Sequence, residues 1–182
     1  IPFEEESISD YALRFCSKVN HPNAVLVGVS FGGIIAQEMN LVHNFRKIVI
    51  ISSVKTRQEL PLHLQLAGKT KVYKLMPTSF FAQNIDLLSK YAFGKPIVKR
   101  LDLYKQYLSI TDKRYLDWAI KQVVSWGQEQ SDSNLVHIHG DKDLIFPIEN
   151  IRDSIVVKGG THIMILNKYK WLNENLPKLI LS

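Results

Sequence analysis

Residues 24–33 read AVLVGVSFGG, an apolar run that leads into a serine flanked by glycines. The unbroken apolar character of residues 24–29 is typical of a short strand buried on both faces, as in a parallel sheet. Residues 34–43 then place their apolar side chains at helical spacing. The stretch therefore predicts a buried strand, a sharp turn at Ser30 and a helix.

Strand-like and helical segments alternate on both sides of this stretch. Before it, residues 8–19 have apolar side chains at helical spacing, with Ser7 as the predicted N-cap. After it, we expect strands at residues 46–53, 135–139 and 154–158, a short helix at 147–153 and a closing helix at 163–181. Parallel strands need crossover connections, which helices supply. The sequence thus predicts an α/β fold with a mostly parallel sheet.

Residues 57–130 interrupt this alternation with helical periodicities and no strand-like run. The segment is too long for a loop, so we predict a helical cap inserted into a core formed by residues 1–56 and 131–182. It holds 12 Lys and Arg residues and 6 Asp and Glu residues. This surplus of positive charge equals the net charge of the whole chain, +6. A solvated exterior is the favoured explanation. The alternative is attraction of an anionic substrate or a carrier-bound acyl group.

Length and composition exclude several classes of protein. The 182 residues, 46% of them hydrophobic, suit one globular unit with a core. No apolar run is long enough to cross a membrane, and no basic-aromatic motif predicts nucleic-acid binding. The single cysteine, Cys16, excludes an internal disulfide and a thiolate-rich metal site. A cytoplasmic location is the default expectation, and nothing in the sequence indicates the oligomeric state.

The segment from Gly28 to Gly32 fits the pattern G-x-S-x-G, placed where a buried strand turns into a helix. A strained turn at this place lifts the serine Oγ above the sheet. We expect the flanking glycines to be required because a Cβ there would collide with neighbouring backbone.

Two further segments follow later strands and bear groups that could act on this serine. GDKDLIFP begins at Gly140, and within it we assign Asp143 as a triad acid and Asp141 as a turn former. GGTH ends at His162, which could deprotonate Ser30 and later protonate a leaving group. The chain order is serine, aspartate, histidine.

The segments GVSFGG, HGDKDLIFP and GGTHIMIL together resemble the α/β-hydrolase family. This resemblance implies that Ser30 is the nucleophile, Asp143 the acid and His162 the base, with the backbone N–H of Phe31 as an oxyanion donor. It also implies a hydrolase of the serine esterase type, which cleaves a small-molecule carboxylic ester or thioester through an acyl-enzyme. That chemistry requires no cofactor and no metal.

The resemblance covers the C-terminal half of the usual fold. Members of the family carry earlier strands and a His-Gly loop that supplies a second oxyanion N–H, and nothing before Ser7 matches that loop. We therefore expect the parent protein to have an additional N-terminal segment of some tens of residues. The alternative function is a non-catalytic α/β-hydrolase-like binding protein or an inactive truncated form.

Other residues have weaker functional interpretations. We predict that Phe80, Phe81 and Trp118 of the cap line an apolar acyl pocket over Ser30, although most cap aromatics should pack the cap onto the core. His137 and His139 share one strand face and could ligate a metal, but no third ligand is evident. We expect Cys16 to be a small buried hydrophobic residue.

Overall fold

The computed structural model describes residues 1–70 and 112–182. Its described helices, 3-10 helices (η) and strands follow one another along the chain as α1 (Ile8–Cys16), β1 (Val25–Val29), α2 (Phe31–Val42), β2 (Lys47–Ile51), η1 (Arg57–Glu59), α3 (Leu62–Thr70), α7 (Lys113–Ser125), β3 (Leu135–Gly140), η4 (Ile148–Asn150), β4 (Ile155–Val157), α8 (Met164–Asn167) and α9 (Tyr169–Leu181). The predicted strands and most of the predicted helices are therefore confirmed in type and order.

The described strands form one sheet in the order β1-β2-β3-β4, with every neighbouring pair parallel. The register pairs Val29 of β1 with Ile51 of β2, and Ile51 in turn with Ile138 of β3. All strands consequently end at the same edge of the sheet. The predicted α/β fold with a parallel sheet is confirmed.

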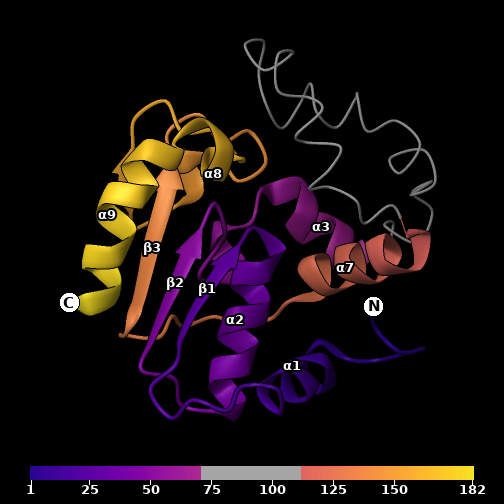
Figure 1. The fold of residues 1–182 in the computed structure, drawn as a ribbon. Coiled ribbons are helices and arrows are strands. Elements are labelled where there is room, and N and C mark those ends of the chain that lie inside the picture. The colour runs from indigo at the N-terminus through magenta and orange to yellow at the C-terminus, as the bar shows by residue number, and fades with distance from the viewer. Residues whose placement is uncertain (71–111) are drawn as a thin grey trace.

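Alternate residues of β2 face two different helices, which gives the sheet two covered faces. Ile48 and Ile50 pack with Ala36 of α2, whereas Val49 and Ile51 belong to a cluster that includes Leu172 of α9. In Figure 1 the yellow helix α9 lies beside the orange strand β3, and α1 and α2 lie together near β1. This three-layer arrangement holds the strand ends in fixed positions.

The expectation that residues 24–29 are buried on both faces is wrong, because among them only Gly28 is buried. Val27 is 44% exposed, whereas Val25 and Val29 pack at the margin of the cluster under α9. In the described part of the chain, β1 forms the end of the sheet next to β2 only, and α9 covers the strands further along. An apolar run reports strand character, but it does not tell which strand lies at the end of a sheet.

The helix ends also differ from the sequence-based boundaries. The helix α1 stops at Cys16, and the predicted closing helix is divided into α8 and α9 by Lys168, whose φ of −125° and ψ of 24° leave the helical region. Just before the break, Asn167 donates its side-chain N–H to the carbonyl of Gly159. Ser7 caps α1 as predicted, accepting a hydrogen bond from the N–H of Asp10.

The predicted cap can be followed only in part. Its described pieces, η1, α3 and α7, are helical, and the remainder lies outside the described residues. The division into core and cap therefore stays a prediction. Within residues 1–70 and 112–182, no helix combines the length and the apolar character needed to cross a membrane.

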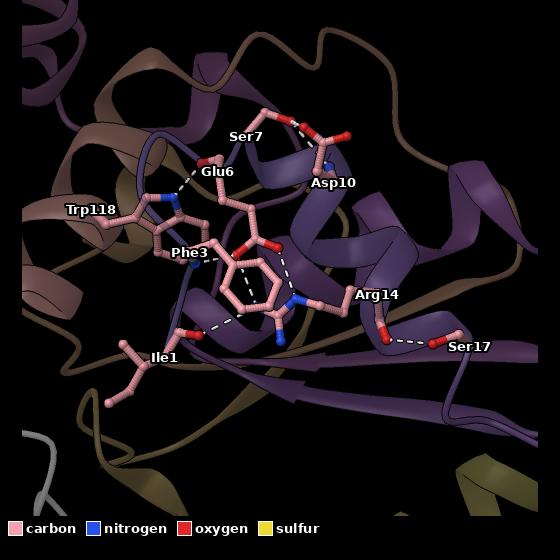
Figure 2. A network of polar contacts seen from close by, with 8 residues as sticks. All are labelled: Ile1, Phe3, Glu6, Ser7, Asp10, Arg14, Ser17 and Trp118. Carbon is pink, nitrogen blue, oxygen red and sulfur yellow. Dashed lines mark hydrogen bonds and ion pairs between the residues drawn. The ribbon is translucent and has the colours of Figure 1, made fainter.

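The N-terminal segment is fastened to α1 and α7 by the network in Figure 2. Glu6 forms a two-point ion pair with Arg14, at 2.8 Å for each contact, and the Arg14 guanidinium lies over the ring of Phe3. The buried indole N–H of Trp118 donates to the carbonyl of Glu6 at 2.6 Å. The ion pair lowers the pKa of the Glu6 carboxyl, chiefly through the Arg14 hydrogen bond.

This network predicts a measurable contribution from the Trp118 indole N–H. We expect Trp118→Phe to lower the free energy of unfolding by about 1–3 kcal/mol, because the change leaves the Glu6 carbonyl without its buried donor. Urea unfolding followed by circular dichroism would measure it. Trp171→Phe, at a half-buried position of α9, is the matched control. Equal stabilities of the Trp118 variant and the unchanged protein would show that the hydrogen bond from the indole to the Glu6 carbonyl does not stabilise the fold.

Candidate active site

Ser30 stands at the junction of β1 and α2 in a strained backbone conformation. Its φ is 54° and its ψ is −124°, and a positive φ is uncommon for a residue with a Cβ. The Ser30 N–H still continues the sheet by donating to the carbonyl of Ile51, while the Ser30 carbonyl accepts from the N–H of Gly33. The turn predicted at this serine is therefore present, tied to β2 on one side and to α2 on the other.

The glycines around Ser30 are not equivalent. A Cβ on Gly28 would collide with the Gly32 carbonyl group, at 2.6 Å from its carbon, and a Cβ on Gly33 would lie 2.5 Å from the hydroxyl of Ser53. A Cβ on Gly32 would meet no described atom within 4 Å. The predicted steric need for glycine thus holds at Gly28 and not at Gly32, and it extends to Gly33.

The structure brings the predicted serine, histidine and aspartate into one hydrogen-bonded line. The Ser30 Oγ lies 2.8 Å from His162 Nε2, and His162 Nδ1 lies 2.9 Å from Asp143 Oδ2 and 3.1 Å from Oδ1. An ionised carboxylate can only accept, so the shared proton belongs to Nδ1, and Nε2 is left to accept from the serine hydroxyl. A serine oxygen in this state can lose its proton to the imidazole as it attacks.

Asp143 is buried, and the turn that carries it supplies hydrogen-bond donors. Its side chain is fully buried, and Oδ1 accepts the backbone N–H groups of Ile145 and Phe146, each at 2.9 Å. The Phe146 ring also packs edge-on against His162, with ring centroids 5.4 Å apart. These contacts fix the orientation of the carboxylate relative to the imidazole.

The loops that bear Asp143 and His162 are joined where β3 and β4 end. A Cβ on Gly160 would lie 2.9 Å from the Cα of Gly140, so the two backbones touch at this point. Asp141 accepts the N–H of Gly159 at 2.5 Å. Asp141, assigned from the sequence as a turn former, therefore links the acid loop to the histidine loop, a role that the spacing of GDKD alone could not reveal.

His137 and His139 lie side by side behind Asp143, both buried. Burial lowers the pKa of His137 to about 3 and also lowers that of His139. Among the described residues, no group of three or more His, Cys, Asp or Glu side chains is arranged to hold a metal ion. The two rings instead bond to each other and to the backbone of the acid turn.

The lowered pKa of His137 predicts an acid-sensitive step in stability. Between about pH 6.5 and 3 the unfolded chain binds a proton at this residue that the folded chain does not, so stability falls as the pH falls through this window. We expect His137→Gln to reduce the slope of unfolding free energy against pH by about 1.4 kcal/mol per pH unit near pH 5. Urea unfolding between pH 4.5 and 5.5 would measure both slopes. Equal slopes for the unchanged protein and His137→Gln would contradict this account. His21→Gln, in an exposed loop, is the control and should leave the slope unchanged.

The remaining predicted site residues are placed as follows. Phe31 opens α2, so its N–H has no acceptor within the helix and is available beside Ser30. Trp118 is buried and packs edge-on against Phe31, with ring centroids 5.6 Å apart. Phe80 and Phe81 lie outside the described residues. Cys16 is half-buried, its thiol directed at the Met39 carbonyl, and burial raises its pKa.

Comparison with known proteins identifies the fold. No family model and no curated protein matches the sequence. A solved thermophilic esterase is 19% identical, with a TM-score of 0.64, over 98% of this chain and 74% of its own. The enol-lactonase from Burkholderia xenovorans LB400 is 12% identical, with a TM-score of 0.64, over 100% of this chain and 75% of its own. An alpha/beta hydrolase enzyme from a Medee basin deep-sea metagenome library is 14% identical, with a TM-score of 0.63, over 98% of this chain and 74% of its own.

Proposed function

We propose that this chain, which has the α/β-hydrolase fold, is a serine hydrolase that cleaves a carboxylic ester or thioester through an acyl-enzyme. The observation that supports the proposal is the continuous line from the Ser30 hydroxyl through His162 to the buried Asp143 carboxylate. Each contact in that line is at hydrogen-bond distance before any substrate is bound.

Acylation begins with attack of the Ser30 Oγ on the carbonyl carbon, while the hydroxyl proton passes to His162 Nε2. The resulting imidazolium lies against Asp143, which stabilises its positive charge. His162 then gives that proton to the departing alcohol or thiol. A water molecule attacks the acyl-enzyme in the same way, with His162 as base, and releases the acid together with free Ser30.

Phe31 is the proposed donor to the oxyanion. It is the first residue of α2, so its backbone N–H is free of helical acceptors and the positive end of the helix dipole lies at the same place. A developing negative oxygen beside Ser30 would be stabilised by both. Removing one such donor typically costs about 100- to 1,000-fold in turnover, so this single N–H is a substantial part of the proposal.

The finer features of the proposal come from the sequence. Residues 57–130 form the predicted cap, and Trp118 with Phe80 and Phe81 the predicted acyl pocket. Trp118 is compatible with this role through its contact with Phe31 next to Ser30. The predicted substrate is a small-molecule ester or thioester, anionic or carrier-bound if the positive cap attracts it, and the predicted location is the cytoplasm.

Active-site labelling would test the proposal. A fluorophosphonate probe should modify the protein at Ser30, as mapped by peptide mass spectrometry, and hydrolysis of short-chain p-nitrophenyl esters and thioesters should accompany it. Ser17→Ala is the matched control and should label fully, because the Ser17 hydroxyl only donates to the Arg14 carbonyl on the surface. A folded protein that neither labels nor hydrolyses any of these substrates would instead support a non-catalytic binding protein.

A further inference from the structure

A relay of buried hydrogen bonds lies behind the acid of the proposed triad. His137 Nε2 is 3.2 Å from His139 Nδ1, and His139 Nε2 is 2.8 Å from the carbonyl oxygen of Phe146. His137 is 2% exposed and His139 is 0% exposed. Both residues come from β3, two positions apart, so their rings stand on one face of the strand.

The partners in this relay fix its proton positions. The Phe146 carbonyl can only accept, so His139 carries a proton on Nε2. Burial lowers the pKa of His139, which favours the neutral imidazole with Nδ1 as an acceptor. The proton between the two rings therefore belongs to His137 Nε2. Only one tautomer of His139 satisfies both of its contacts.

Phe146 connects this relay to Asp143. Its N–H donates to Asp143 Oδ1 at 2.9 Å, while its carbonyl accepts from His139. The Nε2 of His139 also lies 3.6 Å from Asp143 Oδ2, the oxygen that faces His162 Nδ1. One imidazole thus fixes the far end of the acid turn and places the positive end of an N–H dipole near the carboxylate.

We propose that His139 is a positioning residue of the triad, which holds the turn from Asp143 to Phe146 so that Oδ2 stays against His162. The inference rests on the proposed function for its kinetic consequence. His139 exchanges no proton with substrate. It restricts rotation of the Asp143 carboxylate, and His137 restricts the tautomer of His139.

Two variants separate positioning from simple core packing. His139→Phe keeps an aromatic ring but removes the donor to Phe146, and we expect kcat to fall by about 10- to 100-fold with KM within about twofold. His139→Gln places an amide N–H where Nε2 stood, and we expect it to restore most of kcat. His21→Gln, in an exposed loop, is the control and should behave as the unchanged protein.

Proton NMR gives a readout that requires no substrate. The His162 Nδ1 proton, hydrogen-bonded to Asp143, should appear at low field in the unchanged protein and in His139→Gln, and should weaken or move upfield in His139→Phe. In ¹⁵N-labelled unchanged protein, His139 should show a protonated Nε2 and an unprotonated Nδ1. This second measurement applies even where His139→Phe does not fold.

The outcomes distinguish the two proposals. A folded His139→Phe protein with unchanged kcat and an unchanged low-field resonance would overturn the role of His139, as would the opposite tautomer of His139 in the unchanged protein. An unchanged protein that turns over no ester, yet shows the low-field proton and its loss in His139→Phe, would reject the hydrolase function and keep the positioning role.

Discussion

We expect Ser30→Ala to lower kcat for a short-chain p-nitrophenyl ester by about 10⁴- to 10⁶-fold, because the attacking oxygen is removed. The fold should remain, since the strained turn is held by backbone contacts of Ser30 with Ile51 and Gly33 rather than by its hydroxyl. Initial rates would give kcat, and circular dichroism would give the melting temperature. Turnover within tenfold of the unchanged protein would contradict the assignment of Ser30.

A double variant makes this prediction sharper. Every proposed proton transfer by His162 belongs to a mechanism that begins with attack by the Ser30 oxygen, so Ser30→Ala with His162→Ala should be no slower than Ser30→Ala alone. Independent contributions would instead multiply the two losses. Ser17→Ala is again the control for removal of a hydroxyl, and its rate should be unchanged.

The sequence predicted the candidate triad because each of its members follows directly from a strand. Parallel strands present their carboxyl ends at one edge, so groups after β1, β3 and β4 lie at the same edge of the sheet. The shared edge of Ser30, Asp143 and His162 is therefore a consequence of topology, whereas their hydrogen bonds also depend on the loops after β3 and β4. Their catalytic roles remain predictions.

The contacts behind the triad could not be predicted in the same way. The alternation of His137 and His139 was visible and offered no third metal ligand, but it did not show that His139 bonds to a backbone carbonyl seven residues further along the chain. That contact depends on how the turn after Asp143 folds back over the strand. Residue types and spacing do not contain this information. The same holds for the Asp141 contact with Gly159, which joins two loops through backbone geometry.

The two glycines of the G-x-S-x-G pattern should respond very differently to alanine. We expect Gly28→Ala to lower the free energy of unfolding by about 3 kcal/mol or more, because the new methyl group would collide with the backbone of Gly32 and Gly33. The strand and the first turn of α2 would have to separate, and that movement displaces Ser30 from His162. Urea unfolding and ester turnover should both report the damage.

Gly32→Ala is the matched comparison within the same motif. Its Cβ would meet no described atom within 4 Å, and alanine is the better helix former, so we expect a change of at most about 1 kcal/mol in stability. Because the new methyl group would stand one residue from Phe31, beside the proposed oxyanion donor, any activity loss should come from access of substrate and raise KM more than it lowers kcat. If Gly28→Ala and Gly32→Ala destabilise the protein equally, the close backbone contact at Gly28 is not the reason for glycine at that position.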